Sequence, residues 1–388
     1  MDVEDFTAVQ HPADDPDSDT VTTHFEYHCM EDNLLKLDML GHDDPTMIRM
    51  LEDLTGVNAR AIPLDDPDTM SIFTSSKVLG FENDEILGPT GAVAIPEFNT
   101  RFTRGMLMDT MPKDFNTLVR LSGFSHGTDV WLGNARDLIV GGTASVLETV
   151  GCRDDIMLYL ISMGLDPKMS FKIMEAVRKG KVKKGGFQEG WEEAMREHQV
   201  PDWYIGSLAK IGYLFPKAHA VAYVMMAFRI AWFKVHEPLA FYATFFSIRA
   251  KAFDAEYCCA GMDAVKQKIR EIENNKDATD VEQNLLVTLE VCYEFYLRGF
   301  HFDTISIYDS DATHFKVTEN GLLPPFVTVR GLGETAALDT VEKRQGKTFV
   351  SVEEFATTCN KLSKTHIEQL KALGAFAGMA DTSQVALF

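Results

Sequence analysis

The segment around residue 216 places cationic side chains at the expected start of a long apolar helix. Pro216 has a fixed φ and no N–H group, so it suits the first helical turn. Lys217 and His219 fall on the same turn, where unpaired N–H groups and the positive end of the helix dipole favour anions. The pattern predicts a phosphate-binding site. The alternative is an exposed lysine beside a hydrogen-bonded core histidine.

A second concentration of positive charge runs from Lys172 to Lys184 and includes Arg178, Lys179 and Lys181. Glycines at 180, 185 and 186 interrupt it and would let backbone amides approach an anion closely. These features are compatible with contacts with phosphates. A solvated helix terminus explains the same residues, because cations are favoured near the C-terminal end of a helix.

Small and hydroxyl residues surround a glycine in the stretch Ser125-His126-Gly127-Thr128-Asp129. A tight polar loop of this kind suits close packing against a ligand or another segment. Thr128 or Asp129 could instead cap the segment that follows. The adjacent Ser and His do not indicate a hydrolase, since triad geometry is not encoded by adjacency.

Lys36 and Asp38 lie two residues apart in a β-prone run and would share one face of a strand. A carboxylate here could help hold Mg²⁺ against substrate phosphates, but two-metal chemistry needs several carboxylates. Taken alone, Asp38 is explained by default as a surface carboxylate.

Two patterns near the C-terminus suggest binding rather than catalysis. Gly331-Leu332-Gly333-Glu334-Thr335 forms a Gly-x-Gly turn into a helix, whose amides could hold a DNA phosphate without reading sequence. A plain helical packing unit is the alternative. The last five residues, Gln384 to Phe388, end on Leu387 and Phe388 after a polar stretch. Such a tail could insert two apolar side chains into a partner's pocket, whereas a frayed end is the default expectation.

Longer blocks of the sequence carry a resemblance to a known family. Residues 122–135, 151–157, 172–181 and 215–223 resemble the fingers domain of PolC-type (C-family) bacterial DNA polymerase III alpha subunits. Residues 32–44 look like the end of the palm domain of the same family. The resemblance continues from there to the last residue, so it covers nearly the whole chain.

The resemblance implies template-directed addition of dNTPs to a primer, with Mg²⁺ as cofactor. Asp38 matches the third of three metal-binding aspartates and Lys36 lies beside it, but the Asp-x-Asp pair of the palm has no recognisable counterpart here. The residues implied for the dNTP and nascent base pair are Ser125, His126, Thr128, Asp129, Arg178, Lys179, Lys217 and His219. Those implied for DNA are Lys181, Gly331, Gly333 and Thr335, and those for the sliding clamp are Gln384, Leu387 and Phe388.

The expected fold is mainly α. A small α+β palm remnant (1–68) would precede helical fingers (69–299), a duplex-binding helix-hairpin-helix region (300–378) and a clamp-binding tail (379–388). The expected partners are primer–template DNA, dNTPs, the β sliding clamp and the remainder of a polymerase subunit in the replisome. Because the Asp-x-Asp pair is missing, we expect no activity from this chain alone. A non-catalytic DNA- and clamp-binding module, such as one half of a split polymerase, is the competing interpretation, and a truncation without an independent role is another.

The elements that would position these residues follow from local patterns. A helix is expected at Thr46–Leu54, two more within Asp254–Tyr296, and β-prone runs at Thr22–His28, Leu34–Leu40 and Phe300–Val317. Residues 218–233 are the most apolar helical stretch, and its internal His and Arg indicate a buried core helix rather than a membrane span.

Composition limits the class of protein. The chain has 388 residues, 45% of them hydrophobic, enough for two or three domains. Its net charge of −21 excludes an overall basic nucleic-acid binder. Residues 1–70 hold 18 Asp or Glu against 3 Lys or Arg, a balance of −15 that leaves −6 for the rest. The six cysteines form no Cys-x-x-Cys pair, which fits a reducing cytoplasm and predicts neither a zinc ribbon nor a disulfide framework.

Overall fold

The computed structural model describes residues 2–30, 32–35 and 42–382. The chain divides into two compact units, residues 1–43 and 44–388. In the first unit, β1 (Val9–Gln10) pairs antiparallel with β2 (Thr22–Thr23), and the 3₁₀ turns η1 (Val3–Asp5), η2 (Pro12–Asp14) and η3 (Tyr27–Cys29) surround this pair in the chain. The β-prone run at 22–28 therefore yields a strand of only two residues. Residues 34 and 35 are not in a strand, and the rest of that run lies outside the described residues.

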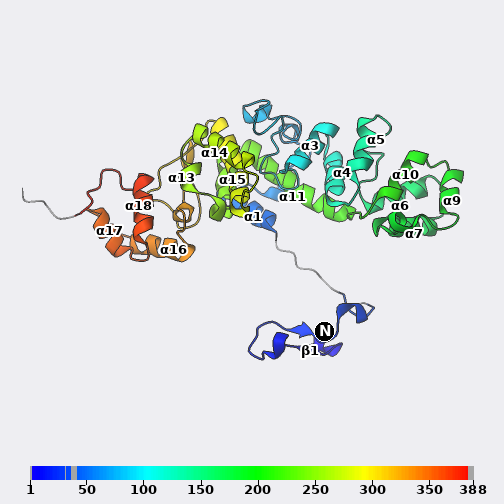
Figure 1. The fold of residues 1–388 in the computed structure, drawn as a ribbon, viewed down its shortest axis with the longest axis horizontal. Helices are drawn as coiled ribbons and strands as arrows, with labels where there is room; N and C mark the ends of the chain where they lie inside the picture. Colours follow the sequence, from blue (N-terminus) through cyan, green and yellow to red (C-terminus); the bar gives the residue numbers. More distant parts are fainter. Residues whose placement is uncertain (1, 31, 36–41, 383–388) are drawn as a thin grey trace, which may run out of the picture. The chain divides into compact units, whose positions relative to one another are not determined.

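The second unit is built from helices, which confirms the expected mainly helical fold (Figure 1). The helices are α1 (Asp43–Thr55), α2 (Pro67–Ser71), α3 (Arg101–Thr110), α4 (Phe115–His126), α5 (Arg136–Val140), α6 (Arg153–Ser162), α7 (Pro167–Arg178), α8 (Lys181–Gly185), α9 (Trp191–Glu197), α10 (Asp202–Lys210), α11 (Lys217–His236), α12 (Pro238–Ile248), α13 (Ala255–Cys258), α14 (Met262–Asn274), α15 (Asp280–Leu297), α16 (Glu334–Lys343), α17 (Val352–Thr358) and α18 (Lys364–Ala372).

Side-chain caps fix where many of these helices begin. An Asp, Ser or Thr oxygen accepts a hydrogen bond from a first-turn amide and satisfies a donor that the helix cannot. The capping residues of α2, α3, α4, α7, α15, α17 and α18 are Asp66, Thr100, Asp114, Asp166, Thr279, Ser351 and Ser363. The sequence therefore encodes these boundaries locally.

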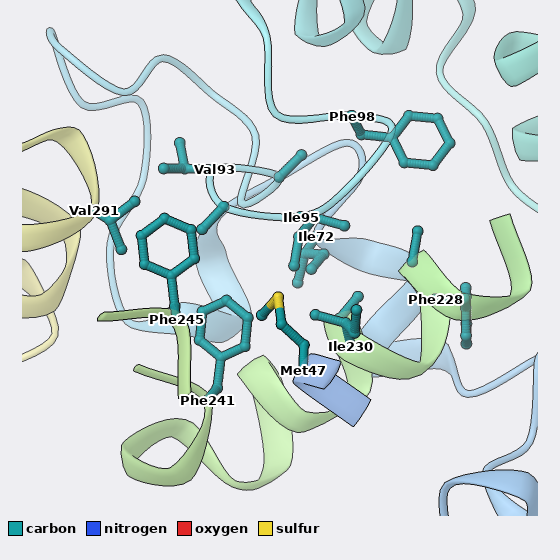
Figure 2. Packing of buried hydrophobic residues seen from close by; sticks show 14 of the residues in the cluster. Met47, Ile72, Val93, Ile95, Phe98, Phe228, Ile230, Phe241, Phe245 and Val291 are labelled. Atoms are coloured by element: carbon teal, nitrogen blue, oxygen red, sulfur yellow. The ribbon is translucent and has the colours of Figure 1, made fainter. Parts of the chain in front are cut away.

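The helix α11 runs through the hydrophobic core of this unit and contacts α2, α4 and α12. It is long and apolar enough to span a membrane by length and composition. However, residues along its length, including Val224, Phe228 and Phe233, are buried against other elements of the protein. Figure 2 shows Phe228 and Ile230 of α11 within this core. The expectation of a buried core helix is confirmed.

A buried ion pair lies inside the same core. The Lys234 ammonium is 2.7 Å from Glu294 Oε1, and both side chains are fully buried. Tyr242 donates to the same carboxylate oxygen at 2.7 Å. Removing one partner of such a pair leaves a buried charge uncompensated, which costs about 3–5 kcal/mol. The pair therefore fixes α11, α12 and α15 against one another.

A small sheet connects the large helical part to the last three helices. β3 (His301–Phe302) pairs parallel with β5 (Gly321–Leu323), and β4 (Lys316–Val317) pairs antiparallel with β5. A 3₁₀ turn, η8 (Phe326–Thr328), leads into the region of α16, α17 and α18, which lie together in Figure 1.

Candidate functional site

Two loops that are far apart in the sequence meet beside the start of α11. The Thr128 N–H group donates to the Tyr213 carbonyl at 2.9 Å, and the Gly212 N–H group donates to the Thr128 carbonyl at 2.9 Å. This bridge brings the polar loop after α4 next to the segment that begins α11. The sequence stretches around 125–129 and 215–219 therefore form one site, which we call the finger cluster.

His126, at the end of α4, is held from two sides. Its Nε2 lies 2.6 Å from Glu97 Oε2, which also accepts a hydrogen bond from Ser122 Oγ at 2.9 Å. The hydrogen bond to Glu97 raises the pKa of the His126 imidazole above its usual 6.5, against the opposing effect of burial. Its ring stacks on Phe215 with centroids 4.7 Å apart. His126 is therefore a cationic, oriented ring over a wider pH range than a free histidine.

The other residues of this loop have defined partners. Ser125 Oγ donates to the Ser122 carbonyl at 3.0 Å. Asp129 has a positive φ of 56°, and its Oδ2 forms an ion pair with Lys183 Nζ at 2.5 Å. Thr128 is exposed, and its backbone makes the bridge to Tyr213. The alternative that Thr128 or Asp129 caps the next helix is wrong, since the segment that follows has Val130 at its start with no side-chain cap.

The C-terminal end of α7 joins the same cluster. The Arg178 carbonyl accepts from the Leu214 N–H group at 3.3 Å, and Gly180 has a φ of 65°. A Cβ on Gly180 would lie 2.5 Å from the Gly212 carbonyl oxygen. Only glycine permits this approach, because the backbones are in contact and φ is positive.

The two cations that end α7 share one carboxylate. Arg178 donates to both oxygens of Glu175, and Lys179 Nζ lies 3.1 Å from Glu175 Oε2. The hydrogen bond from Arg178, followed by that from Lys179, lowers the pKa of Glu175 to about 2. Glu175 thus neutralises part of the charge expected for phosphate. Lys181 is exposed at the start of α8 and makes no ion pair within the described part of the chain.

The start of α11 differs from the sequence-based expectation in one respect. Pro216 is the N-cap residue rather than part of the first turn, and the Lys217 N–H group donates to Asp154 Oδ2 at 3.0 Å. The first amide of the helix is therefore occupied by a carboxylate of α6 and is not bare. Lys217 Nζ lies 3.6 Å from Asp155 Oδ1. His219 is exposed and packs edge-on against Phe215 with centroids 5.7 Å apart.

The glycine turn before α16 leaves backbone donors available. Gly331 has a φ of 76°, and Gly333 is the N-cap residue of α16 with no side-chain cap. Within the described residues, the N–H groups of Gly333, Glu334 and Thr335 have no hydrogen-bond partner. Arg330, just before the turn, is held by Asp254 at 2.7 Å and Glu256 at 3.1 Å. Arg330 therefore anchors the turn to the large helical part. The unpaired N–H groups lie at the exposed start of α16.

Two family models match the chain over these same parts. Residues 44–199 match the bacterial DNA polymerase III alpha subunit finger domain, and residues 299–385 match the helix-hairpin-helix motif. The chain is 54% identical over 385 residues to a PolC-type DNA polymerase III from Caldanaerobacter subterraneus, and 50% identical over 389 and 393 residues to those of Halalkalibacterium halodurans and Streptococcus mutans.

The chain belongs to the PolC-type DNA polymerase III family. The matches cover 99–100% of this chain but 27% of each of these relatives. The resemblance seen in the sequence blocks is therefore confirmed, and so is the order of a finger domain followed by a helix-hairpin-helix region.

Several family residues fall outside the described part of the structure. Lys36 and Asp38, implied for catalysis and metal binding, lie there, as do Gln384, Leu387 and Phe388, implied for the clamp. Among the described residues, no group of three or more His, Cys, Asp or Glu side chains could hold a metal ion. The described part of this chain therefore does not fit a Mg²⁺ site of the PolC-type family by itself.

Sequence reasoning missed the carboxylates that organise the finger cluster. Asp155 Oδ2 accepts from Arg120 at 2.8 Å and from the amides of Gly151 and Cys152 at 3.1 and 2.9 Å. Glu97 belongs to a loop whose sequence carries no functional pattern. Asp154 and Asp155 lay within a block that matches the family, which was a signal for the region but not for their roles.

Proposed function

We propose that this chain forms the finger and duplex-binding part of a PolC-type replicative DNA polymerase of the bacterial cytoplasm. The observation that carries the proposal is the convergence of residues 125–129, 178–183 and 212–219 on one polar cluster. In this site, Lys183 and Lys217 attract the triphosphate of an incoming dNTP, the loop at 125–129 packs against the nascent base pair, and Lys181 contacts the DNA. Arg178 and Lys179 also bind the triphosphate, once their contacts with the Glu175 carboxylate are replaced by contacts with phosphate oxygens.

The work of the finger cluster is binding and orientation. Charge-assisted hydrogen bonds to phosphate oxygens fix the triphosphate without reading the base. The complete polymerase needs Mg²⁺ to neutralise charge on the reacting phosphate, and Asp38 is proposed as one of its ligands. The sequence has no recognisable counterpart of the Asp-x-Asp pair that would complete such a site, so the chain is expected to add no nucleotides alone.

Primer extension tests this assignment. The purified chain should not extend a primer, whereas a mixture with a fragment carrying the upstream palm should do so in the presence of Mg²⁺. Asp38→Ala should abolish the activity of the mixture. Metal-dependent extension by the isolated chain would contradict the proposal, and binding of DNA without any reconstituted extension would favour the alternative of a non-catalytic DNA- and clamp-binding module.

The second half of the proposal concerns DNA. The unpartnered amides before α16 hold a phosphate of the primer–template duplex, in the way a helix start binds anions. Thr335→Glu would place a carboxylate among these donors and should weaken duplex binding about tenfold, the loss of roughly one charge-assisted contact. Thr357→Glu on α17 adds the same charge at another exposed threonine and serves as the control. Equal effects of the two variants would show that only net charge matters.

A further inference from the structure

Glu97 is an acidic residue held in an unfavourable backbone conformation. Its φ is 69°, a left-handed value that side chains other than glycine rarely adopt. Its side chain is only 7% exposed. Such strain persists only where the surrounding structure enforces it, and it concentrates at functional sites.

The loop that carries Glu97 packs against the hydrophobic core, which holds it in place. Ala92, Val93, Ile95 and Phe98 are all buried. Figure 2 shows Ile95 beside Ile72 and Val93 on the side of Val291, within the core that also holds side chains of α1, α11 and α12. A segment so packed has little freedom to relax the strain at Glu97.

The buried ammonium of Lys234 fixes the backbone of the same loop. Lys234 Nζ donates to the carbonyls of Gly91 and Val93 at 2.7 and 2.6 Å, in addition to its ion pair with Glu294. The Ala94 N–H group donates to Asn99 Oδ1 at 2.6 Å and closes the loop on itself. The carboxylate of Glu97 is thus presented by a rigid platform.

Glu97 contacts one side of the His126 ring only. Its Oε2 lies 2.6 Å from Nε2, and an ionised carboxylate can only accept, so Nε2 must carry a proton. Phe215 covers one face of the ring. Nδ1 has no hydrogen-bond partner among the described residues, and the His126 side chain is 39% exposed. One nitrogen is therefore anchored while the other remains available.

We propose that Glu97 is a positioning residue for nucleotide binding: its carboxylate holds Nε2 and fixes the His126 ring against Phe215, so that Nδ1–H of the protonated ring donates to a phosphate oxygen of the incoming nucleotide. This inference rests on the proposed function of the finger cluster. A neutral ring with its proton on Nε2 would present a lone pair at Nδ1 and would repel a phosphate oxygen. The carboxylate therefore decides which kind of group the ring can bind.

The surroundings of His126 define how this interaction depends on pH. The charged group in contact with the ring is Glu97, from the 91–99 loop, and Ser122 of α4 shares that carboxylate. From α11, His219 and Tyr223 pack against the same Phe215 ring. Because the pKa of His126 is raised above 6.5, more than half of the rings are cationic at pH 6.5, and the cationic fraction increases as the pH falls further. It is lost as the pH rises through the raised value.

The test uses the whole chain and the variants Glu97→Gln and His126→Gln. The first readout is the titration of the His126 ring by NMR, assigned through its loss in His126→Gln. We expect a wild-type midpoint above 6.5 and a lower midpoint in Glu97→Gln, because the hydrogen bond from the imidazolium to the carboxylate is lost. Asp109→Asn removes a carboxylate that pairs with Arg136 outside the cluster and should leave the midpoint unchanged. An unchanged midpoint in Glu97→Gln would overturn the role of Glu97.

The second readout is binding of inorganic tripolyphosphate to the same proteins at pH 7. Glu97→Gln and His126→Gln should each weaken binding about tenfold, and the double variant no further, because both remove the same contact. A lower midpoint with unaltered binding would overturn the phosphate contact.

If Glu97→Gln fails to fold, the pH profile of wild-type binding decides. The expected profile is a decrease through one ionisation above pH 6.5 that is absent in His126→Gln, and a flat profile would contradict the proposal. Absence of any tripolyphosphate binding by the wild type would contradict the finger-cluster function itself, while the NMR midpoints would still report on Glu97.

Discussion

At the level of single residues, the cations of the finger cluster are already paired with carboxylates of the protein. Lys217 faces Asp155, Lys183 faces Asp129, and Glu175 holds the end of α7. A substrate phosphate would therefore exchange one anionic partner for another rather than meet free charges. Such exchange lowers the gain from each contact but keeps the side chains oriented before the nucleotide arrives.

Lys217→Ala tests this exchange in the complete polymerase. Because phosphate carries no base identity, the substitution should raise KM for all four dNTPs by a similar factor, about tenfold for one charge-assisted contact. Lys276→Ala removes an exposed lysine between α14 and α15 and is the control. Steady-state primer extension measures both. An effect confined to one dNTP would place Lys217 at the base instead, and no effect would leave it as a structural residue.

The pKa of Glu175 gives a pH-dependent prediction. Since this pKa is lowered to about 2 from the usual 4.5, the carboxylate contributes stability that is complete above about pH 4.5. That contribution is lost as the pH falls through about 2. Urea midpoints of the wild type and Glu175→Gln should therefore differ at pH 5 and converge towards pH 2. Glu189→Gln, at an exposed position, should show no such convergence. A constant difference across this range would contradict the ion pair.

At the level of elements, close backbone contacts set the position of α4. A Cβ on Gly123 would overlap the carbonyl of Gly151, so α4 and the loop before α6 meet at a glycine. Gly123→Ala should lower the free energy of unfolding by about 1–3 kcal/mol through overpacking. Gly105→Ala lies within α3 with nothing near its Cβ and should raise it by about 0.5–1 kcal/mol. Urea denaturation of the two variants measures both free energies of unfolding. Equal changes in Gly123→Ala and Gly105→Ala would show that α4 can move to accommodate the added methyl group.

The sequence could predict elements that depend on local patterns, but not contacts between residues far apart in the chain. The helix expected at Thr46–Leu54 falls within α1, and the two expected within Asp254–Tyr296 correspond to α14 and α15, which the short α13 precedes. Their periodicity is local. In contrast, the Glu97–His126 hydrogen bond joins residues 29 apart, and the Lys217–Asp154 bond joins residues 63 apart. Partners at such separations depend on how helices pack, which spacing in the sequence does not contain.

At the scale of the whole molecule, charge is unevenly distributed. The net charge is −21, and most of the excess falls in residues 1–70. Screening limits the reach of an exposed charge to about 10 Å at 0.1 M salt. The proposed phosphate contact at the glycine turn before α16 would therefore be compatible with the acidic net charge, and its affinity should be modest and confined to that contact. This arrangement favours duplex binding within a larger polymerase over tight binding by the chain alone.

The C-terminal tail yields a prediction for the chain as a partner of other proteins. Gln384, Leu387 and Phe388 form the proposed clamp-binding motif, in which two apolar side chains fill a pocket and the glutamine makes a polar anchor. A five-residue peptide fills a small groove, so the affinity for the β sliding clamp should be on the order of micromolar. Deleting Leu387 and Phe388 should abolish clamp binding in a calorimetric titration and leave Tm unchanged, because the deleted residues are not expected to join the core. The double substitution Leu387→Ala and Phe388→Ala should have the same effect while preserving chain length. If the shortened chain binds the clamp as tightly as the intact one, the contact lies elsewhere in the protein.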